Sequence, residues 1–508
     1  MGTQAPEAHR RDARDGSTAV AELLDGHPAV RDGQWLYLVL PRSMHAVRVP
    51  LDQEAGAPWR SVLAGYPSLR DARLSRPEAD PWGVTLVVGH RCNLSCVYCF
   101  SEVGHSTATL EADRMMAVVD HTLERRPSAQ NKLFGVNFFG GEPTLAMSDI
   151  EKVVAHTERM CAAKKVAPYF TMVTNGTAPR EALQYLVDHR FTLTVSMDAA
   201  PERQGGQRIY GKRHNVDQTI DTIRFLADAG VPYRVRSTVT GETVHHMGET
   251  VEFFAGLGAD FIHFEPVGPV GTTTPGRLSR YSEPSAEDYA ENLLHAMDVA
   301  RGIDVSVFSY AFQHLLSSPP RSYCGPMSGG DSYHVLNATG ELIMCPEMQD
   351  PARNKQYGHN VGRATDRNVV FVDLVRKDEI GHSALPSQHQ SCQTCYARDI
   401  CDSGCPSRNI QATGSLTKLD RYSCAVAKRV CADVLRRLAV ETFDAVKPTA
   451  EPLVKPIALP RELCSAPLVG SAVDILQRAK VVFALTRERL DPAVDTEIAR
   501  LRRLGTIR

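Results

Sequence analysis

The feature that most constrains the fold is an alternation of apolar, strand-length runs with helix-length segments between residues 82 and 302. The predicted strands are residues 83–88, 133–139, 169–175, 192–198, 233–240 and 261–267, and the predicted helices are residues 111–125, 148–164, 179–189, 216–230, 248–258 and 286–301. Repeated strand–helix units predict a parallel sheet with right-handed crossovers. Six units rather than eight favour an α/β fold built on a partial (β/α)6 TIM-like barrel, with functional loops after the C-terminal ends of its strands. An open doubly wound sheet is the alternative, but no G-x-G-x-x-G follows the first strand, which weakens a dinucleotide-binding interpretation.

Composition divides the 508 residues into five parts. Residues 1–18 are charged and predicted to be disordered. Residues 19–81 form a small α+β module with a β-hairpin at 34–51 and a short helix within 55–81. The barrel, 82–315, is followed by a cysteine-rich region, 316–430, which is too poor in apolar residues to build a large core. The tail, 431–508, is predicted to be helical, with a Pro-rich linker at 447–460 and helix-period apolar residues at 472–485.

Charge and hydropathy exclude several kinds of partner. Lys and Arg number 57 against 59 acidic residues, a net charge of −2, so no field for nucleic acid or an anionic membrane is expected. No run approaches the roughly 20 apolar residues of a membrane-spanning helix, and the N-terminus lacks an apolar signal region. A cytoplasmic protein is the expectation, and in that compartment 13 cysteines indicate metal ligands rather than disulfides.

Three cysteines follow the first predicted strand. Cys92, Cys96 and Cys99 have the spacing C-x3-C-x2-C, and such closely spaced soft ligands favour zinc or an iron–sulfur cluster. Since both kinds of site ordinarily take four protein ligands, either a fourth cysteine comes from elsewhere or one iron is left open. The residues of the loop alone leave both possibilities open.

The second predicted strand ends in Gly140-Gly141-Glu142-Pro143. With the three-cysteine loop one unit earlier, and Tyr98 before its third cysteine, this run resembles the signatures of the radical S-adenosylmethionine (SAM) enzymes. The resemblance implies a [4Fe-4S] cluster whose open iron chelates SAM, reductive cleavage of SAM to methionine and a 5′-deoxyadenosyl radical, and abstraction of a hydrogen atom from substrate. The cofactor-binding residues that it implies are Tyr98, Gly140, Gly141, Glu142, Pro143, Asn175, Ser196, Asp198, Arg208 and Arg236.

Several of these residues depart from the family pattern or have a second interpretation. Ser196-Met197-Asp198 resembles the family's S-x-D-G, but Ala199 replaces the glycine. The family usually follows this motif with an H-D-x-x-R stretch, and Arg208 is the one plausible match to its arginine. Tyr98 is expected to pack on the cluster or on adenine. Arg236 is expected either to contact the SAM carboxylate or ribose, or to pair with Glu265 inside the barrel.

Seven cysteines lie between Cys324 and Cys424. A zinc-ribbon site would use any four of them and leave three. The full array, C, G-x4-C, C-x2-C-x5-C-x3-C and C, resembles the SPASM domain, which carries two auxiliary [4Fe-4S] clusters. The resemblance assigns one complete cluster to Cys392, Cys395, Cys401 and Cys424, and a second with three thiolates to Cys324, Cys345 and Cys405. The isolated Cys431 is predicted to be a core thiol.

The resemblance is strongest to the SPASM-type maturases of ribosomally made peptides. It implies a precursor peptide as substrate, oxidised to a C–C or thioether crosslink, a reductant such as flavodoxin or ferredoxin, and a possible peptide-recognition role for the N-terminal module. A formylglycine-forming, sulfatase-maturase-like enzyme is an alternative, but it expects an acid directly after Cys345, where Pro346 stands and Glu347 is one residue late. A small-molecule radical SAM dehydrogenase and a zinc-stapled, non-catalytic binding module are further alternatives. Candidate bases are Glu265 and Glu347.

Overall fold

The structure is a computed structural model. The residues that it describes are 21–24, 27–40, 45–55, 60, 63, 82–99, 107–126, 132–204, 206–209, 216–268, 281–311, 331–348, 356–383, 388–397, 401, 405–443 and 453–456. The expected disordered N-terminus, Cys324, Cys464 and the helix-period residues at 472–485 lie outside them, as does most of 55–81.

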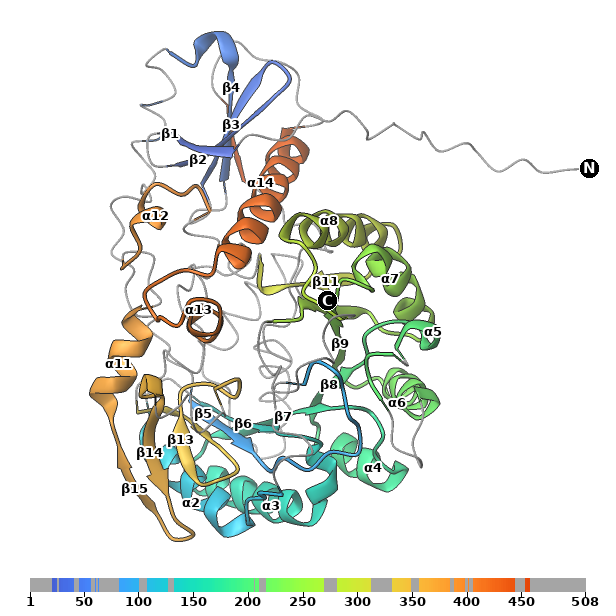
Figure 1. Ribbon diagram of the computed structural model, residues 1–508, viewed down its shortest axis with the longest axis vertical. Helices are drawn as coiled ribbons and strands as arrows, with labels where there is room; N and C mark the ends of the chain where they lie inside the picture. The colour runs from blue at the N-terminus through green and yellow to red at the C-terminus, as the bar shows by residue number, and fades with distance from the viewer. Residues whose placement is uncertain are drawn as a thin grey trace, which may run out of the picture.

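A curved parallel sheet forms the centre of the molecule (Figure 1). Its strands follow one another in chain order: β5 (Gly83–Val87), β6 (Leu133–Phe139), β7 (Ala167–Thr174), β8 (Thr192–Ser196), β9 (Tyr233–Val239), β10 (Phe261–Pro266) and β11 (Ser306–Phe308). The first six are the predicted strands, and the sequential parallel order confirms the partial-barrel prediction over the doubly wound alternative. β11 was not predicted, because a strand of three residues has too little periodicity to be recognised.

Helices line the outer side of this sheet (Figure 1). They are α2 (Ala112–Leu123), α3 (Met147–Ala163), α4 (Arg180–Asp188), α5 (Pro201–Gln204), α6 (Val216–Asp228), α7 (Met247–Gly256) and α8 (Ala286–Gly302). Each long helix buries an apolar stripe; in α4, for example, Leu183 and Leu186 are the buried residues. These side chains join the apolar residues of the strands in one core, so the inner face of the sheet stays available for polar residues.

The cysteine-rich region continues the same sheet. β12 (Tyr333–Leu336) pairs in parallel with β5, and β13 (Glu341–Ile343), β14 (Asn360–Ala364) and β15 (Val369–Val372) follow in antiparallel order. The helices α11 (Leu374–Ser383), α12 (Gln390–Gln393) and α13 (Pro406–Thr413) lie beyond them. Backbone pairing with β5 therefore fixes the start of this region against the barrel.

The N-terminal module is a five-stranded antiparallel sheet with a core of its own. The strands are β1 (Ala21–Leu24), β2 (His27–Asp32), β3 (Trp35–Leu40), β4 (His45–Pro50) and, far along the chain, β16 (Leu453–Pro456). The predicted hairpin is the β3–β4 pair. β16 differs from the linker expected at 447–460, because residues 453–456 pair with β4 at the edge of the sheet, where proline is tolerated.

The long helix α14 (Arg421–Phe443) connects the two sheets. It packs against α8 on one side and against β2, β3 and β4 on the other (Figure 1). Arg48 of β4 is buried, and its guanidinium carbon lies 4.4 Å from the ring of Trp35 and 5.0 Å from that of Phe443. No helix among the described residues, α14 included, has the length and apolarity needed to cross a membrane.

Candidate functional site

The three-cysteine loop follows β5 and is held by backbone hydrogen bonds from two directions. From the turn after β6, Gly141 N donates to Gly89 O and Glu142 N donates to Arg91 O, both at 2.8 Å. From the chain after β8, the carbonyls of Gln207 and Ile209 accept from Val97 N at 2.9 Å and Ser95 N at 2.8 Å. The loop that carries Cys92, Cys96 and Cys99 is therefore fixed at the C-terminal edge of the sheet.

The two glycines after β6 allow this close approach. Gly140 has a φ of +147°, in the region that favours glycine. A Cβ on Gly141 would lie 2.3 Å from the carbonyl oxygen of Arg91. Any side chain at residue 141 would therefore push the turn away from the cysteine loop.

Glu142 is buried and positions the neighbouring strand end. Its Oε1 accepts from Thr144 N, Thr144 Oγ1 and Thr174 Oγ1, and its Oε2 accepts from Asn175 N at 2.6 Å. Burial raises the pKa of this carboxyl and the hydrogen bonds oppose the shift. The carboxylate thus ties the turn after β6 to the end of β7, while Pro143 begins the short helical turn that follows.

Asn175, at the end of β7, reaches the cysteine loop directly. Its Nδ2 donates to Asn93 Oδ1 at 2.8 Å and lies 3.7 Å from Cys92 Sγ, which also accepts from Leu94 N at 3.4 Å. N–H groups that point at a sulfur stabilise it as a thiolate.

Asp198 forms the second anchor of the site, after β8. It is fully buried and accepts hydrogen bonds from Tyr98 Oη, from Gln207 Nε2 at 3.0 Å and from Thr238 N at 3.1 Å. Its Oδ1 also lies 3.0 Å from Arg208 Nη2. The hydroxyl of Tyr98 is therefore engaged by Asp198, which the expected packing on a cluster or adenine did not include.

Arg208 connects Asp198 to the cysteines. Its Nη1 lies 3.9 Å from Cys96 Sγ, and its Nε is buried without a hydrogen-bond partner in the described part of the chain. Burial raises the pKa of the Cys96 thiol to about 12, and Arg208 opposes that shift. Burial likewise raises the pKa of Cys92. Since thiolates here carry a desolvation cost, a cationic metal centre and an anionic ligand for Arg208 both fit the site.

The inner face of the barrel carries four ionisable side chains on two neighbouring strands. Arg234 and Arg236 alternate with the core residue Val235 on β9, and His263 and Glu265 occupy β10. His263 Nε2 lies 3.0 Å from Glu265 Oε1, which also accepts from Tyr310 N at 2.6 Å. Arg234 and His263 were not identified from the sequence. Each lies two positions before a candidate residue, Arg236 or Glu265, and residues two positions apart on a strand share one face.

Glu265 and His263 both have perturbed acidities. Burial raises the pKa of Glu265 to about 7; the hydrogen bond from Tyr310 N and the charges of Arg236 and Arg408 oppose the shift, and Glu347 adds to it. Burial and the two nearby arginines lower the pKa of His263 well below its ordinary value, so its imidazole is neutral. Of the two interpretations of Arg236, the expected ion pair with Glu265 is not among the ion pairs of the described residues.

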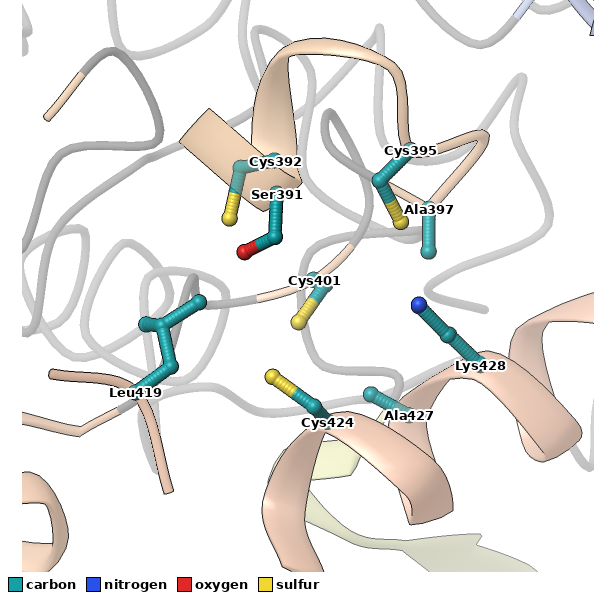
Figure 2. Close-up of a pocket in the computed structure, with 9 residues that line it drawn as sticks. All are labelled: Ser391, Cys392, Cys395, Ala397, Cys401, Leu419, Cys424, Ala427 and Lys428. Carbon is teal, nitrogen blue, oxygen red and sulfur yellow. The ribbon is translucent and has the colours of Figure 1, made fainter. Parts of the chain in front are cut away.

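Four of the cysteines of the cysteine-rich region surround one cavity. Figure 2 shows the sulfur atoms of Cys392, Cys395, Cys401 and Cys424 pointing into it, with Lys428 at its rim. Burial raises the pKa of Cys392 to about 11, with the neighbouring thiols Cys424 and Cys395 as further causes. Residues from α12, from the loop after it and from the first turn of α14 thus converge on one centre.

The other cysteines are placed as follows. Cys345 follows β13, and its Sγ accepts from Glu347 N at 3.4 Å. Cys405 precedes α13, and Cys324 lies outside the described residues. Cys431 is buried in the core, as predicted, and so is Cys161. Ser196 ends β8 and is paired across the sheet with Arg236.

Glu347 and Arg408 each lie two or three residues beyond one of these cysteines. Because both act electrostatically on Glu265, the segments that carry Cys345 and Cys405 approach the inner end of β10.

Comparisons with known proteins agree with this geometry. The family model described as the Radical SAM superfamily matches residues 86–254. A serine-type anaerobic sulfatase-maturating enzyme of Klebsiella aerogenes is 22% identical over 344 residues, which cover 65% of this chain and 80% of the relative. A PqqA peptide cyclase of Streptomyces rochei is 25% identical over 356 residues, which cover 67% and 88%.

The fold also matches a solved structure, anSMEcpe with bound AdoMet and Kp18Cys peptide. The TM-score is 0.58 at 20% sequence identity, covering 71% of this chain and 99% of the other. The cysteine loop, the turn after β6 and the ends of β7, β8 and β9 lie within the matched family segment. Residues 86–254 therefore form a radical SAM domain.

Proposed function

We propose that this enzyme oxidatively modifies a ribosomally made precursor peptide, forming a C–C or thioether crosslink. The observation that carries the proposal is the position of Glu265. This acid has a pKa of about 7, lies on the inner face of the barrel, and is within electrostatic reach of residues beside Cys345 and Cys405. An oxidation that removes hydrogen from a substrate needs a proton acceptor in such a place.

Three groups of cysteines would hold the metal clusters. Cys92, Cys96 and Cys99 would bind the cluster that engages SAM, beside Gly140, Gly141, Asn175 and Arg208. The converging thiols of Cys392, Cys395, Cys401 and Cys424 would bind one auxiliary cluster, and Cys324, Cys345 and Cys405 would bind the other with a ligand position left over. With these groups bound, the site would supply reductive cleavage of SAM, removal of a hydrogen atom from the substrate and, at an auxiliary cluster, an acceptor for the one electron that remains when the substrate is oxidised.

The chain's own residues would orient the bound groups and accept a proton from the substrate. Asp198 holds Arg208 and Tyr98 in place, so that the guanidinium remains directed at Cys96 and at an anionic group of the ligand. Glu142 and Asn175 keep the turn after β6 against the cysteine loop. Glu265 accepts the proton that leaves the substrate when it is oxidised, and Arg236 and Arg408 stabilise the carboxylate form.

A peptide substrate is supported by the names of the similar proteins. One relative is a PqqA peptide cyclase, and the matched structure was solved with a peptide. The five-stranded N-terminal sheet, which includes β16, gives the chain a surface for recognising part of a precursor in addition to the barrel. A small electron donor such as flavodoxin or ferredoxin would supply the reducing equivalents.

Formylglycine formation on a sulfatase is the second candidate. Similarity to the Klebsiella aerogenes enzyme and to anSMEcpe favours it. The residue after Cys345 is Pro346, however, where an acid is expected for that activity, and Glu265 on β10 would have to act instead. The two candidates differ in their substrates, so one assay separates them.

The test is turnover by the anaerobically reconstituted full chain with SAM and a reductant. Its substrates are a small peptide encoded next to this protein, that peptide deuterated at its side chains, and a sulfatase peptide containing Cys or Ser. We expect deuterium to move from the encoded peptide into 5′-deoxyadenosine, and the peptide to lose two hydrogen atoms. Formylglycine in the sulfatase peptide, with the encoded peptide unchanged, would refute the crosslinking proposal in favour of the second candidate. Deoxyadenosine without deuterium or a mass change in either peptide would refute both.

A further inference from the structure

Two histidines and an aspartate meet at the end of the barrel opposite to the cysteine loop. His121 lies in the last turn of α2, Asp331 precedes β12, and His334 is the second residue of β12. Since β12 runs parallel to β5 and begins beside Gly83, the cluster lies at the N-terminal ends of these strands. None of the three residues belongs to the radical SAM motifs or to the cysteine array.

Three atoms of metal-ligand type face one another in this cluster. Asp331 Oδ1 lies 3.3 Å from His334 Nε2 and 3.9 Å from His121 Nε2, and all three atoms lie within 4.8 Å of one another. Each of the three is buried and lacks a hydrogen-bond partner within the part of the chain that the structure describes. The side chain of His334 is 1% exposed. Buried polar atoms are normally paired, so three unpaired ones directed together indicate a ligand.

The protonation state of His334 is fixed by its other nitrogen. Thr122 Oγ1 donates to Val118 O at 2.7 Å, so the contact of 3.0 Å between Thr122 Oγ1 and His334 Nδ1 needs the hydrogen on Nδ1. The neutral imidazole then presents the lone pair of Nε2 toward Asp331. This arrangement of a metal-binding histidine, with its second nitrogen held by the protein, is common in metal sites.

Asp331 is oriented in the same way. Arg125 Nε donates to Asp331 Oδ2 at 2.7 Å, which leaves Oδ1 directed at the two imidazoles. The other charged groups near the cluster are Glu124, whose carboxylate lies 3.8 Å from Arg125 Nη1, and Lys377, whose Nζ donates to Tyr333 O at 2.6 Å. Arg125 and Lys377 lower the affinity for a dication, and Glu124 and Asp331 oppose that effect.

We propose that His121, Asp331 and His334 form a zinc site, with water as the fourth ligand. Two imidazoles and a carboxylate suit Zn²⁺, and bond lengths of about 2.0–2.1 Å place tetrahedral ligand atoms roughly 3.3 Å apart. The distance between Asp331 Oδ1 and His334 Nε2 already has this value. Rotation of the half-buried His121 ring, which lies edge-on to the His334 ring at 5.3 Å between centroids, brings in the third ligand.

The position of the site determines what the metal does. His121 belongs to a barrel helix, whereas Asp331 and His334 belong to the strand that begins the cysteine-rich part of the sheet. Zinc therefore joins α2 to β12 and stabilises the junction between the barrel and the auxiliary-cluster region. Because the site is distant from the C-terminal edge of the sheet, the ion would take no direct part in the proposed reaction.

The test measures zinc bound by the cluster-loaded full chain, so that the cysteines are already occupied by iron. After anaerobic equilibrium dialysis against micromolar zinc, we expect one zinc per chain by elemental analysis. The zinc X-ray absorption edge should show nitrogen and oxygen neighbours at about 2.0 Å and no sulfur at about 2.3 Å. His121→Gln should lose this zinc and retain its iron. His156→Gln, which changes a histidine that pairs with Asp120 outside the cluster, should keep it.

Thr122→Val gives an independent readout that does not remove a ligand. Without the hydroxyl that fixes His334, zinc should bind about 10-fold more weakly, and Thr122→Ser should restore the affinity. Zinc coordinated by sulfur, zinc retained in full by His121→Gln, or no zinc in the wild-type chain would each overturn the proposal. These outcomes are independent of peptide turnover, so they leave the proposed catalytic function untouched.

Discussion

Burial, more than any single neighbouring charge, sets the acidity of Glu265. The carboxylate receives a backbone hydrogen bond from Tyr310 and feels Arg236 and Arg408, yet its pKa is still raised to about 7. The folded protein therefore holds this side chain protonated below about pH 7 and ionised above it. A group with this acidity changes its charge state in the range in which an enzyme usually works.

Product formation should consequently rise with pH through about 7 and level off above it. Glu265→Gln should lower the rate of product formation at least about 100-fold, the usual contribution of a general base, and should leave SAM cleavage within a few-fold of wild type. Quantifying deoxyadenosine and modified peptide across a pH series checks both. Glu252→Gln, an exposed residue of α7, is the matched control. An unchanged pH profile in Glu265→Gln would exclude Glu265 as the base.

The proposed cluster ligands would divide the reaction between two parts of the chain. Cys96→Ala should abolish SAM cleavage, because it removes a ligand of the cluster proposed to engage SAM. Cys395→Ala should leave part of that cleavage and block the modified peptide. Cys161→Ala is the control, since this thiol is buried in the apolar core away from both sets. Equal deoxyadenosine production by wild type and Cys96→Ala would contradict the assignment.

Residue spacing indicated which side chains are candidate ligands, but it did not predict which other residues they contact. The spacing of the cysteines indicated metal ligands, and the resemblance to the SPASM domain divided them between two auxiliary clusters. Spacing could not show that Glu142 is occupied by Thr144, Thr174 and Asn175, or that Tyr98 bonds to Asp198. Apart from the contact with Thr144, these contacts join residues 32 to 100 positions apart, and only the folded chain brings them together.

Among the elements, α14 connects the two sheets, because it packs against α8 of the barrel and against β2, β3 and β4 of the N-terminal sheet. Phe443 is buried, lies 6.0 Å from Tyr37 between ring centroids, and also contacts the guanidinium of Arg48. Phe443→Ala removes a large buried side chain and should destabilise the N-terminal sheet by about 3 kcal/mol. Hydrogen exchange of the β3 and β4 amides measures the loss. Val375→Ala, at a side chain that is 71% exposed, should leave exchange in these strands unchanged. Equal protection in both variants would show that α14 does not hold the sheet.

Elements were predictable where their periodicity was long and strong. The six predicted strands of the barrel carry apolar runs. Three of its helices, α3, α4 and α8, are nine to seventeen residues long and carry amphipathic stripes. β1, β11, β12 and β16 have three or four residues each, which is too few for a pattern. Their pairing partners lie up to hundreds of positions away, so tertiary contacts, not local sequence, make them strands.

At the scale of the whole molecule, the fold joins a catalytic barrel to a cysteine-rich region through one continuous sheet. β12 pairs with β5, the strand that leads into the first cysteine loop. β13 leads into Cys345, and α13 and α14 begin beside Cys405 and Cys424. The two cysteine-bearing parts of the chain are thus held by the same backbone framework, and Glu265 is within electrostatic reach of Glu347 and Arg408 in the second part.

This arrangement predicts the iron content of the intact chain. Three four-iron clusters require about 12 irons and as many sulfides per chain after anaerobic reconstitution. Cys424→Ser removes a ligand from the cavity in Figure 2 and should reduce the count to about 8, because a buried cluster with three protein ligands is lost more readily than one with four. Cys431→Ser, seven residues further along the same helix and in the core, should keep the full complement. About 4 irons in the wild-type chain, or zinc in the four-cysteine cavity, would refute the auxiliary clusters while leaving the radical SAM site intact.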